Sequence, residues 1–217
     1  MSEIPYTVRR STRAQRVRVN VHAHTGVEVV LPSRAPDRAA ATAISELRPW
    51  IERRLAEAQS VLAQIAERQG TVPYLGSALQ LVPQAGRQRV HRDGGELLVP
   101  EGDPGQALER FYRRAARAEI ATRLDRATEC SGTTYSGLTI RAQRTRWASC
   151  SAGGRMSFNW RLLLAPERVL EYVVWHEVCH LEILDHSPRF WALLQRRWPA
   201  YREDRDWLRR HGATLIL

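Results

Sequence analysis

The first third of the chain changes from an alternating to a helical pattern of apolar residues. Within residues 4–31, valines at alternate positions point to one side of an extended segment and polar residues to the other. Gly26 interrupts this pattern, so we expect two strands joined as a hairpin. Residues 35–68 are rich in Ala, Glu, Arg and Leu. Pro49 is expected to divide them into two helices, because a helix tends to end before a proline.

Short extended stretches follow this helical segment. They lie at residues 78–82, 87–92 and 96–99, with glycine-containing turns between them. Together with the first hairpin they predict a small N-terminal lobe over residues 1–102, rich in β-structure and carrying its own helices.

The segment EGDPG at residues 101–105 is typical of a boundary between lobes. Asp103 can cap the helix that follows, and Pro104 suits its first position. The apolar spacing continues this helix to about residue 130, where Ser-Gly is expected to end it.

The C-terminal half combines strands with several helices. Strands are predicted near 138–143 and over 155–164, on either side of a Gly-Gly turn. Further helices are expected to begin at Pro166, at Pro188 and near Tyr201. We therefore assign residues 103–217 to a second lobe and the whole chain to the α+β class.

Composition limits the cellular compartment in which we expect this protein and the kinds of partner that it can bind. The N-terminus has no apolar segment typical of a secretory signal, and no apolar run approaches the ~18 residues that span a bilayer. The three cysteines, Cys130, Cys150 and Cys179, contain no CxxC pair and fit free thiols. We therefore expect a soluble, cytoplasmic protein with no membrane partner. The pattern makes no prediction about its oligomeric state.

The charge permits a nucleic-acid or phosphate partner. The formal net charge is +10, and all 33 basic residues are arginine. The arginines are spread along the whole chain, however, which coding bias explains equally well.

The clearest chemical signal is the motif HExxH at residues 176–180. His176 and His180 are four residues apart, so on a helix both imidazoles can reach one metal ion. Glu177 projects about 100° away from His176, where it can take a proton from metal-bound water. The helix is apolar on nearly all sides, which indicates that it is buried.

A catalytic zinc has three protein ligands and leaves a fourth position for water. His186 lies six residues after His180 and directly before Ser187-Pro188, which is typical of a helix start. The chain therefore turns at His186, whose imidazole can fold back onto the metal.

Other side chains near the motif remain alternatives. Glu182 and Asp185 are rival third ligands, and Asp185 could instead accept a hydrogen bond from a ligand imidazole. Cys179 lies within the motif, but its direction on the helix, about 60° from His176, favours a packed thiol over a ligand. Ile183 stands where metzincins have a glycine, which argues against a metzincin turn.

Four segments resemble the YgjP-like metal-dependent hydrolases, a zincin-like group with relatives among the SprT and WLM proteases. They are QRTRWASCS (143–151), MSFNWRLLLAP (156–166), YVVWHEVCHL (172–181) and HSPRFWALL (186–194). The resemblance is dense over residues 141–212 and implies a zincin-like metallopeptidase lobe.

The resemblance also implies roles for individual residues. His176, His180 and His186 would hold the metal, and Glu177 would act as the base. Residues 155–164 would form the edge strand that borders the cleft, where an extended substrate could add as a further strand.

Arginines precede Trp147 on what should be the cleft side. A guanidinium of Arg144 or Arg146 near the metal can bind a carboxylate or a phosphate, or stabilise an oxyanion. The alternative is a structural ion pair with a carboxylate such as Glu167 or Glu171.

These features predict a zinc-dependent metallopeptidase acting on a peptide or protein, with Glu177 as general base. Another divalent metal could replace zinc. Arg146, Trp147 and Asn159 are the expected substrate-binding residues. Two other functions stay open, which are a nucleotide phosphohydrolase of the nucleoside triphosphate pyrophosphatase type and a basic nucleic-acid-binding protein with a structural metal.

Overall fold

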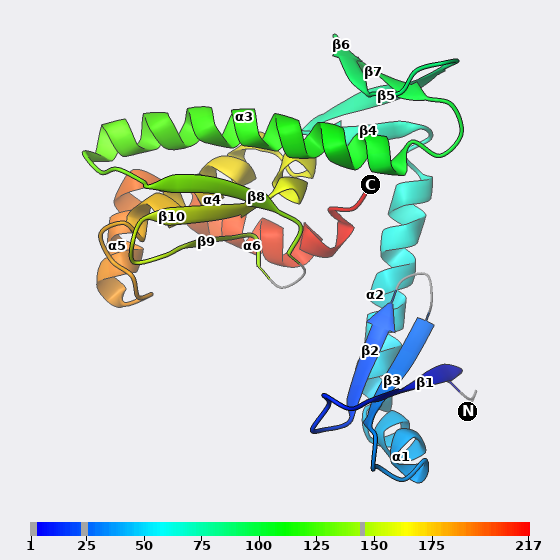
Figure 1. Ribbon diagram of the computed structural model, residues 1–217. Coiled ribbons are helices and arrows are strands. Elements are labelled where there is room, and N and C mark those ends of the chain that lie inside the picture. The colour runs from blue at the N-terminus through cyan, green and yellow to red at the C-terminus, as the bar shows by residue number, and fades with distance from the viewer. Residues whose placement is uncertain (1–3, 23–25, 144–145) are drawn as a thin grey trace. The chain divides into compact units, whose positions relative to one another are not determined.

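The computed structural model describes residues 4–22, 26–143 and 146–217 (Figure 1). It combines helices with small sheets, as the α+β assignment predicted. Its contacts divide it into two compact units, Met1–Glu67 and Arg68–Leu217. Within the described residues, no helix is both long enough and apolar enough to cross a membrane.

The first unit packs two helices on a three-stranded sheet of order β1-β3-β2. Its elements are β1 (Tyr6–Ser11), β2 (Arg18–His22), β3 (Gly26–Pro32), α1 (Arg38–Glu46) and α2 (Arg48–Ala66). β2 and β3 pair antiparallel, which confirms the predicted hairpin, and β1 adds to β3 in parallel. Pro49 lies in the first turn of α2, so the predicted division into two helices is also confirmed.

The second unit begins with a four-stranded sheet of order β4-β5-β7-β6. Its strands are β4 (Thr71–Tyr74), β5 (Ser77–Gln84), β6 (His91–Asp93) and β7 (Glu96–Pro100). The sequence did not predict β4, and only the end of the stretch 87–92 forms a strand. The strands β4 and β6 are too short to form through their own strand preference. Each depends on pairing with a neighbouring strand.

The division between the units lies after Glu67 and not at residue 102, where the sequence suggested a boundary. The strands β4–β7 share one apolar core with the long helix α3 (Gly105–Ser131) and with everything that follows it. The Tyr112 hydroxyl on α3 also donates to the carbonyl of Pro73 on β4, at 2.7 Å. A separate functional role for residues 1–102 and 103–217 stays a prediction.

The helix α3 forms one wall of the second unit and ends where the sequence predicted. Gly132 follows it with a φ of 66°, a left-handed conformation that suits glycine. The buried stripe of α3 repeats every four residues and comprises Leu108, Tyr112, Ala116, Ile120 and Leu124. Figure 1 shows the helix running alongside the second sheet of this unit, where it contacts β8 (Gly137–Arg141).

This second sheet has the order β8-β10-β9, with β9 at Ala148–Cys150 and β10 at Arg155–Asn159. Residues 155–164 are therefore not one edge strand. β10 lies between its two neighbours and stops at Asn159, after which Trp160–Leu164 form the 3₁₀ helix η1. Asn159 caps this turn, because its side chain accepts the Arg161 N–H, and Leu162, Leu163 and Leu164 of the turn are all buried.

The remaining helices surround α4 (Glu167–Cys179). They are α5 (Pro188–Arg197) and α6 (Tyr201–His211), which is followed by the 3₁₀ turn η2 (Gly212–Thr214). All three helices lie where the sequence predicted them. α4 contacts α3, α5, α6, η1 and the edge strand β9, so the helix that carries the HExxH motif is the centre of this unit.

Candidate metal centre

The last turn of α4 brings His176 and His180 together. Their Nε2 atoms lie 3.2 Å apart, as expected for residues one helical turn apart. His180 caps the helix and is almost fully buried, while His176 is half-buried.

His186 reaches the same point from the other side of a turn. After α4 the chain turns, and the Ile183 N–H donates to the Cys179 carbonyl in this turn. Asp185 Oδ1 then accepts the Ser187 N–H at 3.0 Å, just before Pro188 begins α5. This places His186 Nε2 3.1 Å from His176 Nε2.

The three imidazoles form a group whose ligand atoms all lie within 4.8 Å of one another. The alternative ligands proposed from the sequence are not part of this group in the described residues. Glu182 forms an ion pair with Arg197, and the buried thiol of Cys179 also lies near that guanidinium, at 3.7 Å. Asp185 instead holds the backbone of the turn through the Ser187 N–H.

Hydrogen bonding determines which nitrogen of His180 faces the group. Its Nδ1 lies 2.9 Å from the carbonyl oxygen of Ile183. Since a carbonyl oxygen only accepts, Nδ1 must carry the proton, which leaves the lone pair on Nε2. A backbone carbonyl therefore does what the sequence suggested for Asp185.

Two aromatic residues of α5 support the imidazoles. The ring of Phe190, fully buried, stacks on His180 with centroids 4.5 Å apart and lies within 4.9 Å of the rings of His176 and His186. Trp191 packs on His186 at 5.5 Å. Sequence analysis did not assign them this role, although their positions one turn after the Ser-Pro helix start were the available signal.

Burial favours the neutral form of His176 and His180. The pKa of His176 is lowered to about 3, chiefly by burial and in addition by the neighbouring His180 and His186. Burial also lowers the pKa of His180. Neutral imidazoles present lone pairs, which is the form that binds a metal ion.

Glu177 directly follows His176 on α4 and is a buried carboxylate, with 4% of its surface exposed. Desolvation raises its pKa to about 8, while the charge of Arg146 and the backbone N–H of Cys150 act in the opposite direction. Its Oε2 atom is buried and has no hydrogen-bond partner among the described residues.

The arrangement fits a divalent cation. The Nε2 atom of His176 lies 3.2 Å from that of His180 and 3.1 Å from that of His186, and these lone pairs cannot all be satisfied without a proton or a cation between them. Burying a carboxylate is also costly unless a positive charge lies near it. A Nε2 set of three histidines is a donor set that zinc prefers.

The residues expected to bind substrate line a cavity in the same unit. Arg146 is exposed, Trp147 is half-buried and Asn159 is almost fully buried. The Asn159 amide is already engaged, because its Nδ2 donates to the Gln143 carbonyl at 2.8 Å and its Oδ1 accepts the Arg161 N–H at 3.1 Å. Arg144 lies outside the described residues.

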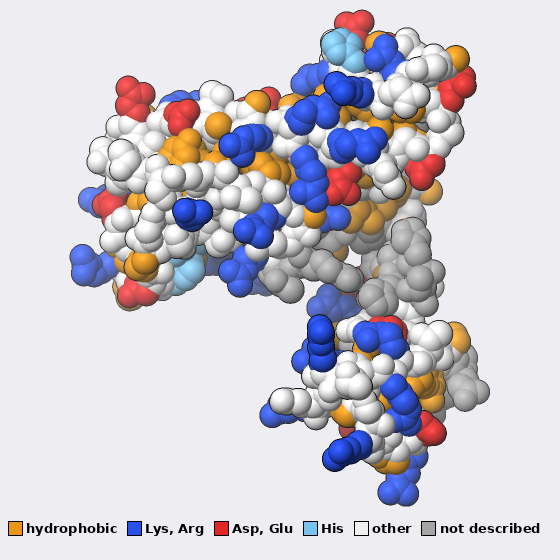
Figure 2. All heavy atoms as spheres, viewed as in Figure 1, with side chains coloured by type: hydrophobic (Ala, Val, Ile, Leu, Met, Phe, Trp, Pro, Cys, Tyr) orange, Lys and Arg blue, Asp and Glu red, His pale blue; other side chains and the backbone are white. Residues whose placement is uncertain are grey.

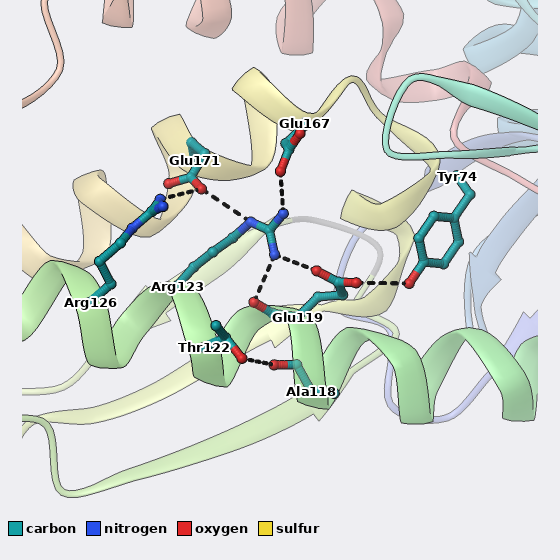
Figure 3. A network of polar contacts seen from close by, with 8 residues as sticks. All are labelled: Tyr74, Ala118, Glu119, Thr122, Arg123, Arg126, Glu167 and Glu171. Atoms are coloured by element: carbon teal, nitrogen blue, oxygen red, sulfur yellow. Dashed lines mark hydrogen bonds and ion pairs between the residues drawn. The ribbon is translucent and has the colours of Figure 1, made fainter.

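The carboxylates considered as partners of these arginines are occupied elsewhere. Figure 3 shows Arg123 on α3 between three carboxylates, to which its guanidinium is bound. These are Glu119 on the same helix and Glu167 and Glu171 on α4. Arg126 also binds Glu171, at 2.6 Å. This network joins α3 to α4, and Arg146 remains without an ion pair among the described residues.

Comparison with known proteins defines the class as a metallopeptidase. The sequence model described as "YgjP-like, metallopeptidase domain" matches residues 15–211, which is most of the chain. The chain therefore belongs to the YgjP-like family.

The other comparisons found little. Among solved structures, the metallopeptidase zymogen abylysin of Pyrococcus abyssi matches with 24% sequence identity and a TM-score of 0.37, over 40% of this chain and 89% of that chain. The search of curated proteins found no match.

Proposed function

We propose that this protein is a zinc-dependent peptidase in which His176, His180 and His186 hold the metal and Glu177 is the general base. The observation that carries the proposal is the convergence of three Nε2 atoms beside a buried carboxylate that has one oxygen with no partner among the described residues. A zinc ion bound there would polarise the scissile carbonyl and lower the pKa of a water molecule.

The surroundings of Glu177 suit proton transfer. The Cys150 N–H holds the carboxylate in place, and Oε2 is available to take a proton from the attacking water. The same oxygen can then deliver this proton to the leaving amine. Because burial strengthens the affinity of Glu177 for a proton, the side chain is suited to both steps.

The edge strand β9 offers a place for an extended peptide. It ends at Cys150, whose backbone is bonded to Glu177, and β10 covers only one of its sides in the order β8-β10-β9. A substrate strand added to the other side would run past the base. The edge strand expected from the sequence is thus replaced in this proposal by β9.

The other two functions receive less support. Figure 2 shows arginines on the visible faces of both units, several of them close together on the second unit, and this charge alone suits many partners. A structural metal site would also have no use for the buried base. A nucleotide phosphohydrolase would use the same metal and base, and the arginines Arg146 and Arg161 would suit its phosphates.

One experiment separates the two enzymatic functions. Metal-loaded protein is assayed on a peptide library and on nucleoside triphosphates, beside Glu177→Gln and the control Glu182→Gln, with metal content measured for each. We expect peptide cleavage that Glu177→Gln abolishes without loss of metal, and near-normal cleavage by Glu182→Gln. Cleavage of triphosphates with intact peptides would refute the peptidase, and loss of metal from Glu177→Gln would refute its role as base.

A further inference from the structure

A cavity of about 650 Å³ lies in the second unit, and the charge of Arg146 in its lining acts on Glu177. Its lining comes from parts of the chain far apart in sequence, namely residues 142, 143, 146 and 147 before β9, the end of β10 with the start of η1, and the C-terminal tail. The lining residues used below are Gln143, Arg146, Trp147, Asn159, Arg161 and Ile216.

The walls of the cavity are held in place. The guanidinium of Arg68 donates to the carbonyls of Thr214 and Ile216, at 2.9 and 2.7 Å, and so fixes the tail. The Trp147 ring packs so closely on Gly212 that a Cβ there would lie 2.8 Å from Cζ2. The cavity is therefore a built feature of the fold.

The polar groups of the cavity are suited to an anion. Its lining contains two arginines, Arg146 and Arg161, and no carboxylate among the described residues. The guanidinium of Arg161 lies over the Trp160 ring at 4.8 Å, which orients it. The guanidinium of Arg146, which has no ion pair among the described residues, favours a carboxylate or a phosphate, and Arg161 adds a second positive charge to the lining.

A further group of the lining can accept a hydrogen bond. The Oε1 atom of Gln143 is buried and has no hydrogen-bond partner among the described residues. Such an acceptor suits a backbone N–H, which a peptide carries beside its carboxylate. The apolar part of the lining, which includes Trp147 and Ile216, suits the carbon atoms of a side chain.

The cavity lies close to the base along the chain. Trp147 directly precedes β9, and its carbonyl accepts the Asn159 N–H at 2.7 Å. The backbone N–H of Cys150, at the other end of this strand, donates to the Glu177 carboxylate. Since a strand rises about 3.3 Å per residue, a peptide lying along β9 can reach from the cavity to the base.

We propose that this cavity is a specificity subsite that binds a carboxylate of the peptide substrate through Arg146 and Arg161. This inference rests on the proposed peptidase function. The carboxylate belongs either to an Asp or Glu side chain or to the free C-terminus of the substrate, and the enzyme cleaves a few residues away from it.

Binding to the Glu177→Gln variant tests the subsite separately from hydrolysis. Fluorescently labelled peptides are compared in pairs that differ only in Glu against Gln, or only in a free against an amidated C-terminus. In one of the two pairs, we expect the peptide with the carboxylate to bind about tenfold more tightly or better. The uncharged peptide of that pair lacks a charge-assisted contact. The pair that responds identifies the source.

Arginine variants complete the test. Arg146→Gln and Arg161→Gln, each combined with Glu177→Gln, should remove most of this preference. The matched control Arg114→Gln, an exposed arginine on α3, should keep it. Equal binding within both pairs, or a preference that survives both arginine variants, would overturn the subsite. The subsite would also be overturned if inorganic phosphate or a nucleoside triphosphate displaced the peptides while both members of each pair bound equally well.

The two proposals fail differently. If metal-loaded wild type cleaves no peptide but the binding preference follows the arginines, the peptidase is wrong and the carboxylate site stands. If peptides are cleaved with no preference at any position, the peptidase stands and the subsite is wrong.

Discussion

The Nε2 atoms of His176 and His186 lie 3.1 Å apart, although ten positions, a helix end and a turn separate the two residues. The turn is held by the Asp185 carboxylate, and the buried Phe190 lies against both rings. This geometry is the reason that the proposed metal site takes His186 as its third ligand.

Removing His186 should therefore release the metal. We expect His186→Ala to weaken zinc binding by more than the about 10–100-fold that loss of an outer contact costs. Glu182→Ala should bind zinc as the wild type does, because Glu182 pairs with Arg197. Zinc titration against a competing chelator measures both. A greater loss in Glu182→Ala than in His186→Ala would assign the third ligand to the carboxylate.

Glu177 should make the stability of the metal-free protein fall as the pH rises. Its pKa is about 8 in the folded protein against an ordinary 4.5, so between these values folding takes up a proton. His176 acts in the opposite sense, because its pKa of about 3 makes folding release a proton up to its ordinary 6.5. Of these two groups, only Glu177 makes the stability depend on pH between pH 6.5 and pH 8.

Urea unfolding of metal-free protein at pH 6.5 and pH 8 measures this contribution. Between pH 6.5 and pH 8, we expect the free energy of unfolding to fall by about 1.5 kcal/mol more in the wild type than in Glu177→Gln. The control Glu182→Gln should behave as the wild type does. The same pH dependence in Glu177→Gln would show that another group is responsible.

Arg123 should stabilise the helix pair that carries the motif. Only 10% of its side chain is exposed, and it neutralises the equally buried Glu171 and its helix neighbour Glu119. Arg123→Met leaves these carboxylates poorly paired, so we expect a loss of about 3 kcal/mol in urea unfolding.

The matched control is Arg126→Met. Its side chain is 62% exposed, so it should cost under about 1 kcal/mol, as exposed ion pairs do. Equal losses in the two variants would mean that the network contributes no more than a surface ion pair.

Gly212 should be intolerant of a side chain. Its φ of −57° is an ordinary helical value, so the obstacle is only the contact with Trp147, whose Cζ2 atom would lie 2.8 Å from an added Cβ. We expect Gly212→Ala to lose about 1–3 kcal/mol of stability and to weaken peptide binding in the cavity. Gly137→Ala, which has open space around its Cβ position, should be within about 0.5 kcal/mol of wild type. Unchanged stability and binding in Gly212→Ala would show that the tail moves aside.

Local patterns predicted most helices. The division at Pro49, the end of α3 at Gly132 and the start of α5 at Pro188 depend on residues within a turn of the boundary. The short strand β4 and the central place of β10 were missed, because both depend on which distant strand pairs with them.

The sequence by itself determined the HExxH helix, its burial, and the i, i+4 spacing that brings His176 beside His180, because these follow from helical periodicity. Only the tertiary structure decided that His186, and not Glu182 or Asp185, joins them, since each alternative is bound by another partner. It also decided where the arginines act. Arg123 is paired across two helices while Arg146 opens onto a cavity that the C-terminal tail completes, and contacts between such distant segments leave no local pattern.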